Sequence, residues 1–177
     1  MSKNIIAAVR TNDELVKATN SGVSIIFMLC PNIWDIESQA RLVHKANKKL
    51  FIHIDLAEGI AKDECGILYA KKCGVDGIIS TRNNVIKLAK SLGIFTVQRF
   101  FIVDSHSVET IIETSKNLKA DMVEVMPGVV PKVIKKLKTK IDMPIVAGGI
   151  IDSEKEIEDA FQSGASAVSI GKESFWR

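Results

Sequence analysis

The chain has 177 residues, enough for one domain with its own hydrophobic core and too few for two ordinary domains. Hydrophobic residues make up 46% of the sequence and charged residues 25%, which is typical of a soluble globular protein and excludes a disordered chain. The formal net charge of +3 permits contact with an anionic partner without requiring one. We therefore expect a single domain over residues 1–177.

Neither membrane insertion nor secretion is expected. The longest strongly apolar run, residues 23–29, is far shorter than the ~20 residues that cross a bilayer, and the N-terminus lacks the apolar stretch and cleavage site of a secretory signal. The cysteines, Cys30, Cys65 and Cys73, form no CxxC pair and cannot all pair with one another, which indicates a reducing compartment. We expect a cytoplasmic protein without a membrane partner, in which the cysteines are small buried hydrophobic side chains.

Short apolar runs alternate with amphipathic stretches along the whole chain. Most runs are continuously apolar, as in parallel strands covered on both faces. Strands are expected at residues 5–9, 24–29, 50–54, 77–79, 96–102, 122–125, 145–147 and 167–170. Helices are expected at residues 35–47, 63–72, 84–92, 108–118, 131–139 and 154–163.

The residue types at the ends of the expected helices support this division. Gly74, Gly93 and Gly164 each follow a helical stretch, where the backbone must turn left-handed before the next strand. Ser107 and Ser153 stand where N-caps are expected, and a glutamate three residues after Ser153 completes the pattern of a capping box.

Eight strands that alternate with helices through short connections predict an α/β fold with a parallel sheet and right-handed crossovers. An open doubly wound sheet and a closed TIM-type (β/α)8 barrel compete, and the strand count and the absence of an early GxGxxG motif favour the barrel. Such barrels usually need at least ~200 residues. Because only residues 171–177 follow the last strand, we expect a compact barrel whose eighth helix is missing or rudimentary. Phe175 and Trp176 beside the resulting groove suggest either a homodimer or aromatic side chains that plug their own barrel.

The last two strands carry glycines at their carboxyl ends, which in a parallel barrel share one rim. Gly148 and Gly149 end the seventh strand, and Gly171 and Lys172 follow the eighth. Phosphate binding needs backbone N–H groups that no Cβ shields, and these two loops are where this fold usually binds phosphate. Alternatively, the glycines only permit tight turns. Lys172 would either add charge to the site or face the solvent.

Acidic side chains follow the third and sixth strands. Asp55 and Glu58 stand shortly after His53, and Glu124 ends the sixth strand. Carboxylates at a rim can bind the hydroxyls of a polyol, act as acid or base, or hold a metal. Alternatively, they form a polar network at the barrel end, with His53 as a core residue. Glu124 lies between two valines, so we expect it to point into the barrel mouth.

Arg82 and Arg99 place guanidinium groups at or near two neighbouring strand ends. They either bind an anion or pair with the rim carboxylates. No lysine inside an apolar strand offers a Schiff-base nucleophile, no histidine cluster has metal-ligand spacing, and neither a GxSxG nor a Walker A motif is present. We expect no catalytic residue, metal or cofactor, although Glu124 or Asp55 could serve as general base in a small phosphosugar isomerase or lyase.

A lysine stripe runs along the sixth expected helix, opposite its apolar face. Such stripes are either solvated surface or part of a nucleic-acid site, and the interleaved aromatic residues that would stack on bases are missing. The candidate RNA-binding residues are Lys132, Lys135, Lys136 and Lys140.

Five motifs occur in order along the chain: HIDLAEG at 53–59, DGIISTR at 76–82, QRFF at 98–101 followed by DS at 104–105, EVMPG at 124–128, and AGGI at 147–150. Together they resemble the glycerol-uptake operon antiterminator regulatory family, bacterial proteins responsive to glycerol 3-phosphate. The resemblance implies a regulator that binds leader mRNA when glycerol 3-phosphate is present and lets transcription pass a terminator. It also implies that Gly148, Gly149 and Gly171 hold the phosphate, and that the polyol and rim contacts are Asp55, Glu58, Arg82, Arg99 and Glu124.

Two other functions stay open at this point. One is the phosphosugar enzyme described above. The other is a sensor of a phosphate-bearing ligand that acts through a protein partner at the groove left by the missing eighth helix.

Overall fold

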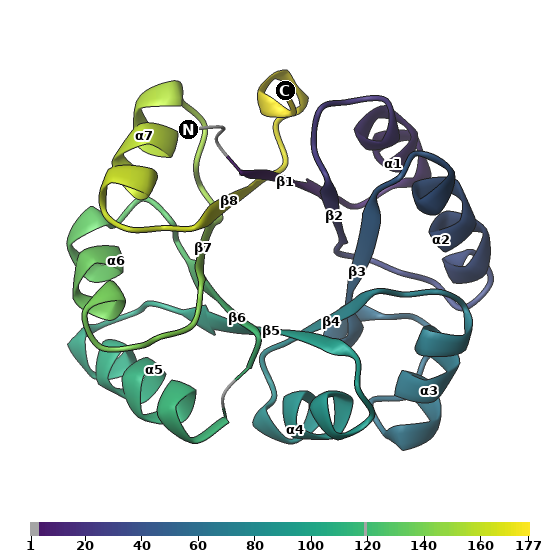
Figure 1. Cartoon of the computed structure of the whole chain (residues 1–177), viewed down its shortest axis with the longest axis horizontal. Helices are drawn as coiled ribbons and strands as arrows, with labels where there is room; N and C mark the ends of the chain where they lie inside the picture. The colour runs from purple at the N-terminus through teal and green to yellow at the C-terminus, as the bar shows by residue number, and fades with distance from the viewer. Residues whose placement is uncertain (1–3, 119) are drawn as a thin grey trace.

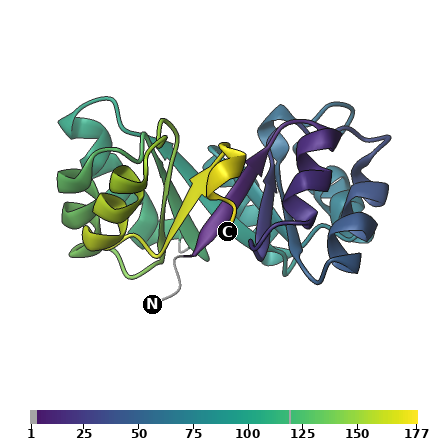
Figure 2. The same ribbon diagram turned by 90° about the horizontal axis from the view of Figure 1, so that it is seen from above.

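The computed structural model describes residues 4–118 and 120–177. In these residues eight parallel strands close into a barrel in the order β1 to β8, and β8 pairs with β1. Helices surround the barrel, which Figure 1 shows down its axis and Figure 2 from the side. The fold is the predicted TIM-type (β/α)8 barrel, and closure excludes the open doubly wound sheet.

Every expected strand is present, with each end displaced by at most one residue. The strands are β1 (Ile5–Val9), β2 (Ile25–Met28), β3 (Lys49–His53), β4 (Gly77–Ser80), β5 (Phe95–Phe101), β6 (Met122–Met126), β7 (Ile145–Gly148) and β8 (Ala167–Ile170). The helices are α1 (Asn12–Thr19), α2 (Ile36–Lys45), α3 (Glu64–Lys72), α4 (Asn83–Ser91), α5 (Ser105–Leu118), α6 (Pro131–Lys138) and α7 (Glu154–Gln162), with 3₁₀ turns η1 (Ile54–Leu56) and η2 (Glu173–Phe175).

Helix α1 is not among the helices expected above. The Thr11 hydroxyl accepts a hydrogen bond from the Glu14 N–H at 3.2 Å, and the Glu14 carboxylate accepts one from the Thr11 N–H at 3.3 Å. These two bonds form a capping box. A threonine followed three residues later by a glutamate is the sequence pattern of such a box, so the start of α1 could have been predicted. The expectation that Ser107 caps α5 was wrong. The helix begins at Ser105, and the Asp104 carboxylate accepts a bond from the Ser107 N–H at 2.8 Å.

The other predicted helix ends are confirmed. Gly74, Gly93 and Gly164 have φ angles of +93°, +67° and +104°, a region that side chains with a Cβ rarely adopt. Ser153 caps α7 in a capping box. These local signals determine where the helices begin and end.

The barrel interior has two layers of different chemistry. The layer near the strand starts is apolar; its buried members are Ile6, Phe27, Phe51, Ile79, Val97, Val146 and Ala167. The layer near the strand ends is polar and holds His53, Arg99, Glu124 and Ser169, all buried. Alternate residues of a strand face the same side, so moving two residues along β3, β5 or β8 changes the layer from apolar to polar.

A short turn stands where an eighth helix would complete the ring, between α7 and α1 (Figure 1). Trp176 is only 4% exposed, and its indole N–H donates to the Ile170 carbonyl at 2.8 Å. The Trp176 carbonyl in turn accepts from the Gly22 N–H at 3.1 Å. The predicted rudimentary eighth helix is confirmed, and Trp176 packs into its own barrel. The homodimer stays a prediction.

The cysteine prediction holds for Cys73, which is buried, and was wrong for Cys30 and Cys65, which are exposed. Cys65 lies on α3, whose helical spacing turns Gly66, Ile67 and Ala70 towards the barrel and so turns Cys65 outwards. Cys30 follows β2 on the rim.

None of the helices in the described part of the chain has both the length and the apolar character that a bilayer-spanning segment needs.

Candidate functional site

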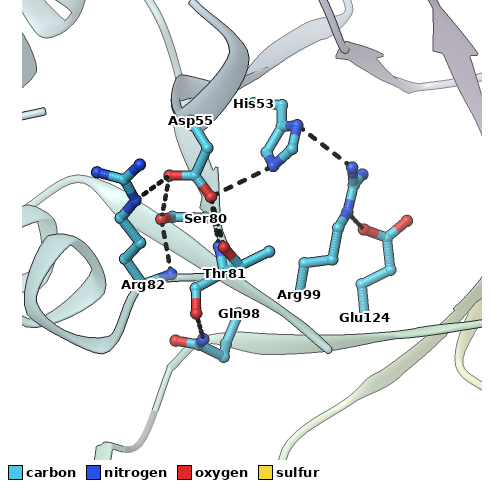
Figure 3. Close-up of polar contacts among 8 residues, drawn as sticks. All are labelled: His53, Asp55, Ser80, Thr81, Arg82, Gln98, Arg99 and Glu124. Carbon is cyan, nitrogen blue, oxygen red and sulfur yellow. Dashed lines mark hydrogen bonds and ion pairs between the residues drawn. The ribbon is translucent and has the colours of Figure 1, made fainter. Parts of the chain in front are cut away.

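The polar layer is a continuous network at the carboxyl end of the barrel, and Figure 3 draws its residues other than Ser169. Arg99 Nε donates to Glu124 Oε2 at 2.6 Å, and Arg99 Nη1 lies 3.4 Å from His53 Nδ1. The second carboxylate oxygen of Glu124 accepts from the Ser169 hydroxyl at 2.6 Å. One buried ion pair thus connects side chains of β3, β5, β6 and β8.

The burial of Arg99 and Glu124 depends on their mutual pairing. Glu124 is fully buried and Arg99 is 5% exposed, and either charge alone in this environment would carry a large desolvation cost. The prediction that Glu124 points into the mouth is confirmed. Arg99 takes part in the structural network, yet its Nη2 group enters none of the hydrogen bonds found among residues 4–118 and 120–177. The guanidinium therefore retains N–H donors beside the mouth.

His53 links Arg99 to Asp55. Arg99 can only donate, so we assign His53 Nδ1 as the acceptor and its ring proton to Nε2. His53 Nε2 lies 3.5 Å from Asp55 Oδ2, a polar contact that does not meet the geometry of a hydrogen bond. His53 was missed as a functional residue, although its position two residues before Asp55 places it in the inward-facing series of β3.

Asp55 organises the loop that follows β4. Its Oδ1 accepts from the Ser80 hydroxyl at 2.7 Å, and its Oδ2 accepts from the Thr81 N–H at 2.7 Å and the Thr81 hydroxyl at 2.8 Å (Figure 3). Burial by itself would raise the pKa of Asp55, but the contacts with His53, Thr81 and Ser80 outweigh it and hold this pKa well below its usual range. Asp55 is therefore ionised at neutral pH, with both oxygens engaged by the protein.

Arg82 and Glu58 lie further from the centre. The Arg82 side chain reaches Asp55 only at 3.9 Å, while its backbone N–H donates to the Ser80 hydroxyl at 3.0 Å. Glu58 stands apart from the network, because its carboxylate accepts from the Asn32 side chain at 3.0 Å and its backbone bridges to the same residue. The structure thus brings together four of the five predicted rim residues and separates Glu58. No three His, Cys, Asp or Glu side chains of the described residues converge as a metal site would require.

Gly148 joins the polar layer to the last two loops. It lies opposite Ser169 in the β7–β8 pair, so the corners at Gly149 and Gly171 are neighbours. A Cβ on Gly148 would collide with Ser169 Oγ and lie 2.7 Å from Glu124 Oε1. The Ser169–Glu124 hydrogen bond therefore passes directly over the Gly148 Cα, and glycine is required at this position. Ser169 was not predicted as a site residue; its signal is its place two residues before Gly171.

Gly171 differs from its neighbours because the fold does not require glycine there. Its φ lies outside the left-handed region, and a Cβ would meet the Ala8 carbonyl oxygen at 3.5 Å, an ordinary contact. Gly149, by contrast, has a φ of +73°, and a Cβ there would lie 2.7 Å from Met126 Cε. In the described part of the chain, the N–H groups of Ile150 and Gly171 donate none of the hydrogen bonds. Two amides at this corner are thus open to an acceptor.

Two further features mark the corner. Lys172 spans the last two loops: its ammonium donates to the Asp152 carbonyl at 3.0 Å and lies 5.2 Å from the ring centroid of Phe175. Ile150 is β-branched yet has a φ of +62°, and its side chain is 75% exposed. Strain of this kind tends to be kept where function needs it.

The lysine stripe on α6 has the predicted geometry. Val133, Ile134 and Leu137 are buried against the barrel, and the lysines between them are exposed. Contact with RNA stays a prediction for Lys132, Lys135, Lys136 and Lys140.

Residues 5–176 match the family described as glycerol-3-phosphate responsive antiterminator. A curated relative, the uncharacterized protein YgcP of Escherichia coli K12, is 36% identical over 173 residues, which cover 97% of this chain and 91% of that protein.

Solved structures agree with this match. A glycerol uptake operon antiterminator regulatory protein from Listeria monocytogenes is 27% identical with a TM-score of 0.92, over 99% of this chain and 96% of that one. A glycerol uptake operon antiterminator-related protein from Thermotoga maritima is 33% identical with a TM-score of 0.88, over 99% of each chain. Aldolase barrels that are 10% to 18% identical are also similar and show the fold alone. With matched sequence and structure over nearly its whole length, this chain belongs to the glycerol-3-phosphate responsive antiterminator family of regulators.

Proposed function

We propose that this chain is a glycerol-3-phosphate-responsive transcription antiterminator that binds the leader mRNA of glycerol-utilisation genes in the cytoplasm. Glycerol 3-phosphate is the effector, and no other cofactor takes part. The observation that carries the proposal is the Ser169–Glu124 hydrogen bond over Gly148, which makes the glycine corner and the polar layer one site.

The phosphate group lies, in this proposal, in the corner formed by Gly148, Gly149 and Gly171. The open N–H groups of Ile150 and Gly171 support this position, because a phosphate offers them acceptors. The lack of a side chain at Gly171, which the fold does not require, leaves room for close approach. Lys172 adds positive charge from the rim.

The glycerol hydroxyls face the polar layer, where Arg99 retains N–H donors. Glu124 and Asp55 act mainly as positioning residues, since protein donors already occupy both oxygens of each. Arg82 and Glu58 contact the ligand at the edge of the site.

The same contacts support binding over catalysis. A general base needs a carboxylate that can reach and accept the substrate proton. Glu124 is paired with Arg99 and Ser169, and Asp55 with Ser80 and Thr81. No observation favours the isomerase or lyase alternative, and we propose no catalytic activity.

Titration with glycerol 3-phosphate, glycerol and inorganic phosphate tests the ligand. A compound that binds only the native state raises Tm by mass action. We expect glycerol 3-phosphate to raise Tm more than either fragment. Equal shifts from glycerol 3-phosphate and phosphate would leave the polar layer without a role, and the absence of any shift would refute the ligand.

Gly171→Ala tests this site most directly, because it should change ligand binding without changing stability. The added methyl group meets only an ordinary contact in the protein, so Tm without ligand should not change. It would obstruct the phosphate, and we expect the Kd for glycerol 3-phosphate to rise by about tenfold or more, equivalent to at least ~1.4 kcal/mol. Ser174→Ala, on the exposed turn nearby, is the matched control and should change neither quantity.

Antitermination is tested with a labelled leader transcript at fixed salt, because nucleic-acid affinity depends strongly on ionic strength. We expect tighter binding when glycerol 3-phosphate is present. An affinity that the ligand leaves unchanged would contradict ligand gating.

A further inference from the structure

The two ends of the barrel carry opposite charge. All strands run the same way, so every helix starts at one end of the barrel and finishes at the other (Figure 2). First turns carry the acidic residues Asp13, Glu14, Glu37, Glu64, Glu154 and Glu156. Last turns carry the basic residues Lys17, Lys45, Lys71, Lys72, Lys90, Lys116, Lys135, Lys136 and Lys138. We call the end with these lysines the basic end.

Helix dipoles favour such a bias, since they attract anions to helix starts and cations to helix ends. The basic end carries further lysines besides single residues at helix ends: α6 has three in its last turn, the loops after α2 and α6 add Lys48 and Lys140, and β3 begins at Lys49. Two aspartates at this end accept backbone hydrogen bonds, Asp76 from the Leu50 N–H and Asp121 from the Thr96 N–H. They also pair with lysines, Asp76 with Lys49 at 3.9 Å and Asp121 with Lys90 at 3.6 Å, so these two lysines add little net charge. Helix α7 has no basic residue in its last turn, so the charge gathers over α2 to α6.

A pocket of about 890 Å³ opens at the same end of the barrel, on the side between α7 and α1. Its walls come from the starts of β1, β2, β6 and β8 and from the sector without an eighth helix. Ile6, Ile25 and Val146 give it an apolar lining, and Asn4, Ser24 and Ser166 supply amide and hydroxyl groups. One acidic and one basic residue, Glu154 and Arg177, also line it. This volume lies within the range of small-ligand pockets, about 300–1,000 Å³.

Lys48 stands at the edge of this pocket. Its ammonium donates to the carbonyls of Ser21 and Val23, and Val23 lines the pocket. An apolar pocket with polar groups at its rim and a lysine at its edge suits an unstacked nucleobase on a phosphate backbone.

Resting on the function proposed above, we infer that the RNA binds at the basic end, opposite the glycerol 3-phosphate site, and inserts an unstacked base into this pocket. The acidic first turns of α1, α2 and α3 at the ligand end would repel a phosphate backbone. Strands β7 and β8 connect the two sites. Val146 and Ala167 line the pocket, while Gly148 and Ser169, two residues further along the same strands, belong to the ligand site.

Charge reversal at the two ends tests this assignment. Lys45→Glu with Lys140→Glu changes two exposed lysines at the basic end. Lys132→Glu with Lys155→Glu makes the same change at exposed positions near helix starts, because this inference assigns RNA contact to Lys135, Lys136 and Lys140 and removes Lys132 from the predicted contacts. Binding is measured by fluorescence anisotropy of a labelled leader transcript at saturating glycerol 3-phosphate. We expect the first pair to weaken binding by about tenfold or more and to reduce its salt dependence, and the second to change it by less than about twofold.

The pocket is tested by Ser24→Trp, which places an indole at an exposed edge residue of the lining. We expect weaker RNA binding and an unchanged Kd for glycerol 3-phosphate. Unchanged RNA affinity would refute base insertion.

The outcomes separate this inference from the proposed function. Wild-type protein that binds no transcript at any ligand concentration would refute the function itself. Wild-type binding that both charge-reversed pairs weaken equally, or that only Lys132 and Lys155 affect, would refute the basic end and retain the function. An acidic peptide, polyglutamate, that competes as well as the transcript would favour a protein partner over RNA.

Discussion

Near the strand starts, the barrel interior is an apolar layer in which Phe27 and Phe51 stack with their ring centroids 5.7 Å apart. Two residues further along the strands, it is a buried ion pair, Arg99–Glu124, with a serine and a histidine around it. Apolar packing needs only shape and volume, whereas each member of the polar layer is stable because the others are present. The comparison shows that a barrel can hold a stabilising apolar layer and a ligand-facing polar layer only two residues apart along the same strands.

Glu124→Ala is expected to have the largest effect, because it removes one member of the polar layer. It leaves the Arg99 guanidinium buried without its partner, and we expect the free energy of unfolding to fall by about 3–5 kcal/mol. Urea denaturation measures the loss. Glu124→Gln keeps the shape and an acceptor and should cost less. A loss below ~1 kcal/mol for the alanine variant would mean that the polar layer is not as dry as its burial indicates.

Asp55 should make the stability of the polar end depend on pH, unlike that of the apolar layer. Its pKa in the folded protein lies below the ordinary value of 3.8, so its stabilising contribution is fully present above that value and is lost as the pH falls through the folded pKa. We expect Asp55→Asn to lower the free energy of unfolding by about 1.5–3 kcal/mol at neutral pH, the range for hydrogen bonds to charged groups.

Denaturation of Asp55→Asn and wild-type protein over a series of pH values checks this. The difference between the two should shrink as the pH falls below 3.8 towards the folded pKa, because Asp55 of the unfolded wild-type chain then binds a proton that Asp55 of the folded protein does not. A difference that stays constant with pH would mean that the charge of Asp55 does not stabilise the fold.

The apolar layer should respond differently. Ile79→Val removes one buried methylene group, and we expect a loss of about 0.5–1.5 kcal/mol that is the same at neutral and acidic pH. Its Kd for glycerol 3-phosphate should match that of the wild type. A clear change in Kd would show that the two layers are coupled more tightly than their chemistry suggests.

The smallest effect is expected on the outer surface. Lys136 is exposed on α6, so Lys136→Gln should change the free energy of unfolding by less than ~0.5 kcal/mol. Thermal denaturation at low and high salt checks this. A larger, salt-dependent change would mean that the lysines of the basic end contribute to the fold and not only to a partner.

The positions of the strands, the closure of the barrel, the short eighth sector and the direction of Glu124 could all be predicted from the sequence. These features follow from short-range rules: runs of apolar residues, glycines that permit left-handed turns, and the number of residues left after β8. Helix α1 and the cap of α5 were predictable by the same rules and were missed, because Thr11 and Asp104 were not recognised as caps.

Only the tertiary structure decided which residues act together. Asp55 and Glu58 are three residues apart, yet the 3₁₀ turn between β3 and the loop sends one into the network and the other to Asn32. Arg99 and Ser169 meet Glu124 from 25 and 45 residues away, and their pairing makes glycine necessary at position 148. The division of charge between the two ends likewise arises only when the parallel strands bring all helix starts to one end. Short-range chemistry fixes the elements, but pairing across the barrel depends on closure, which no local pattern records.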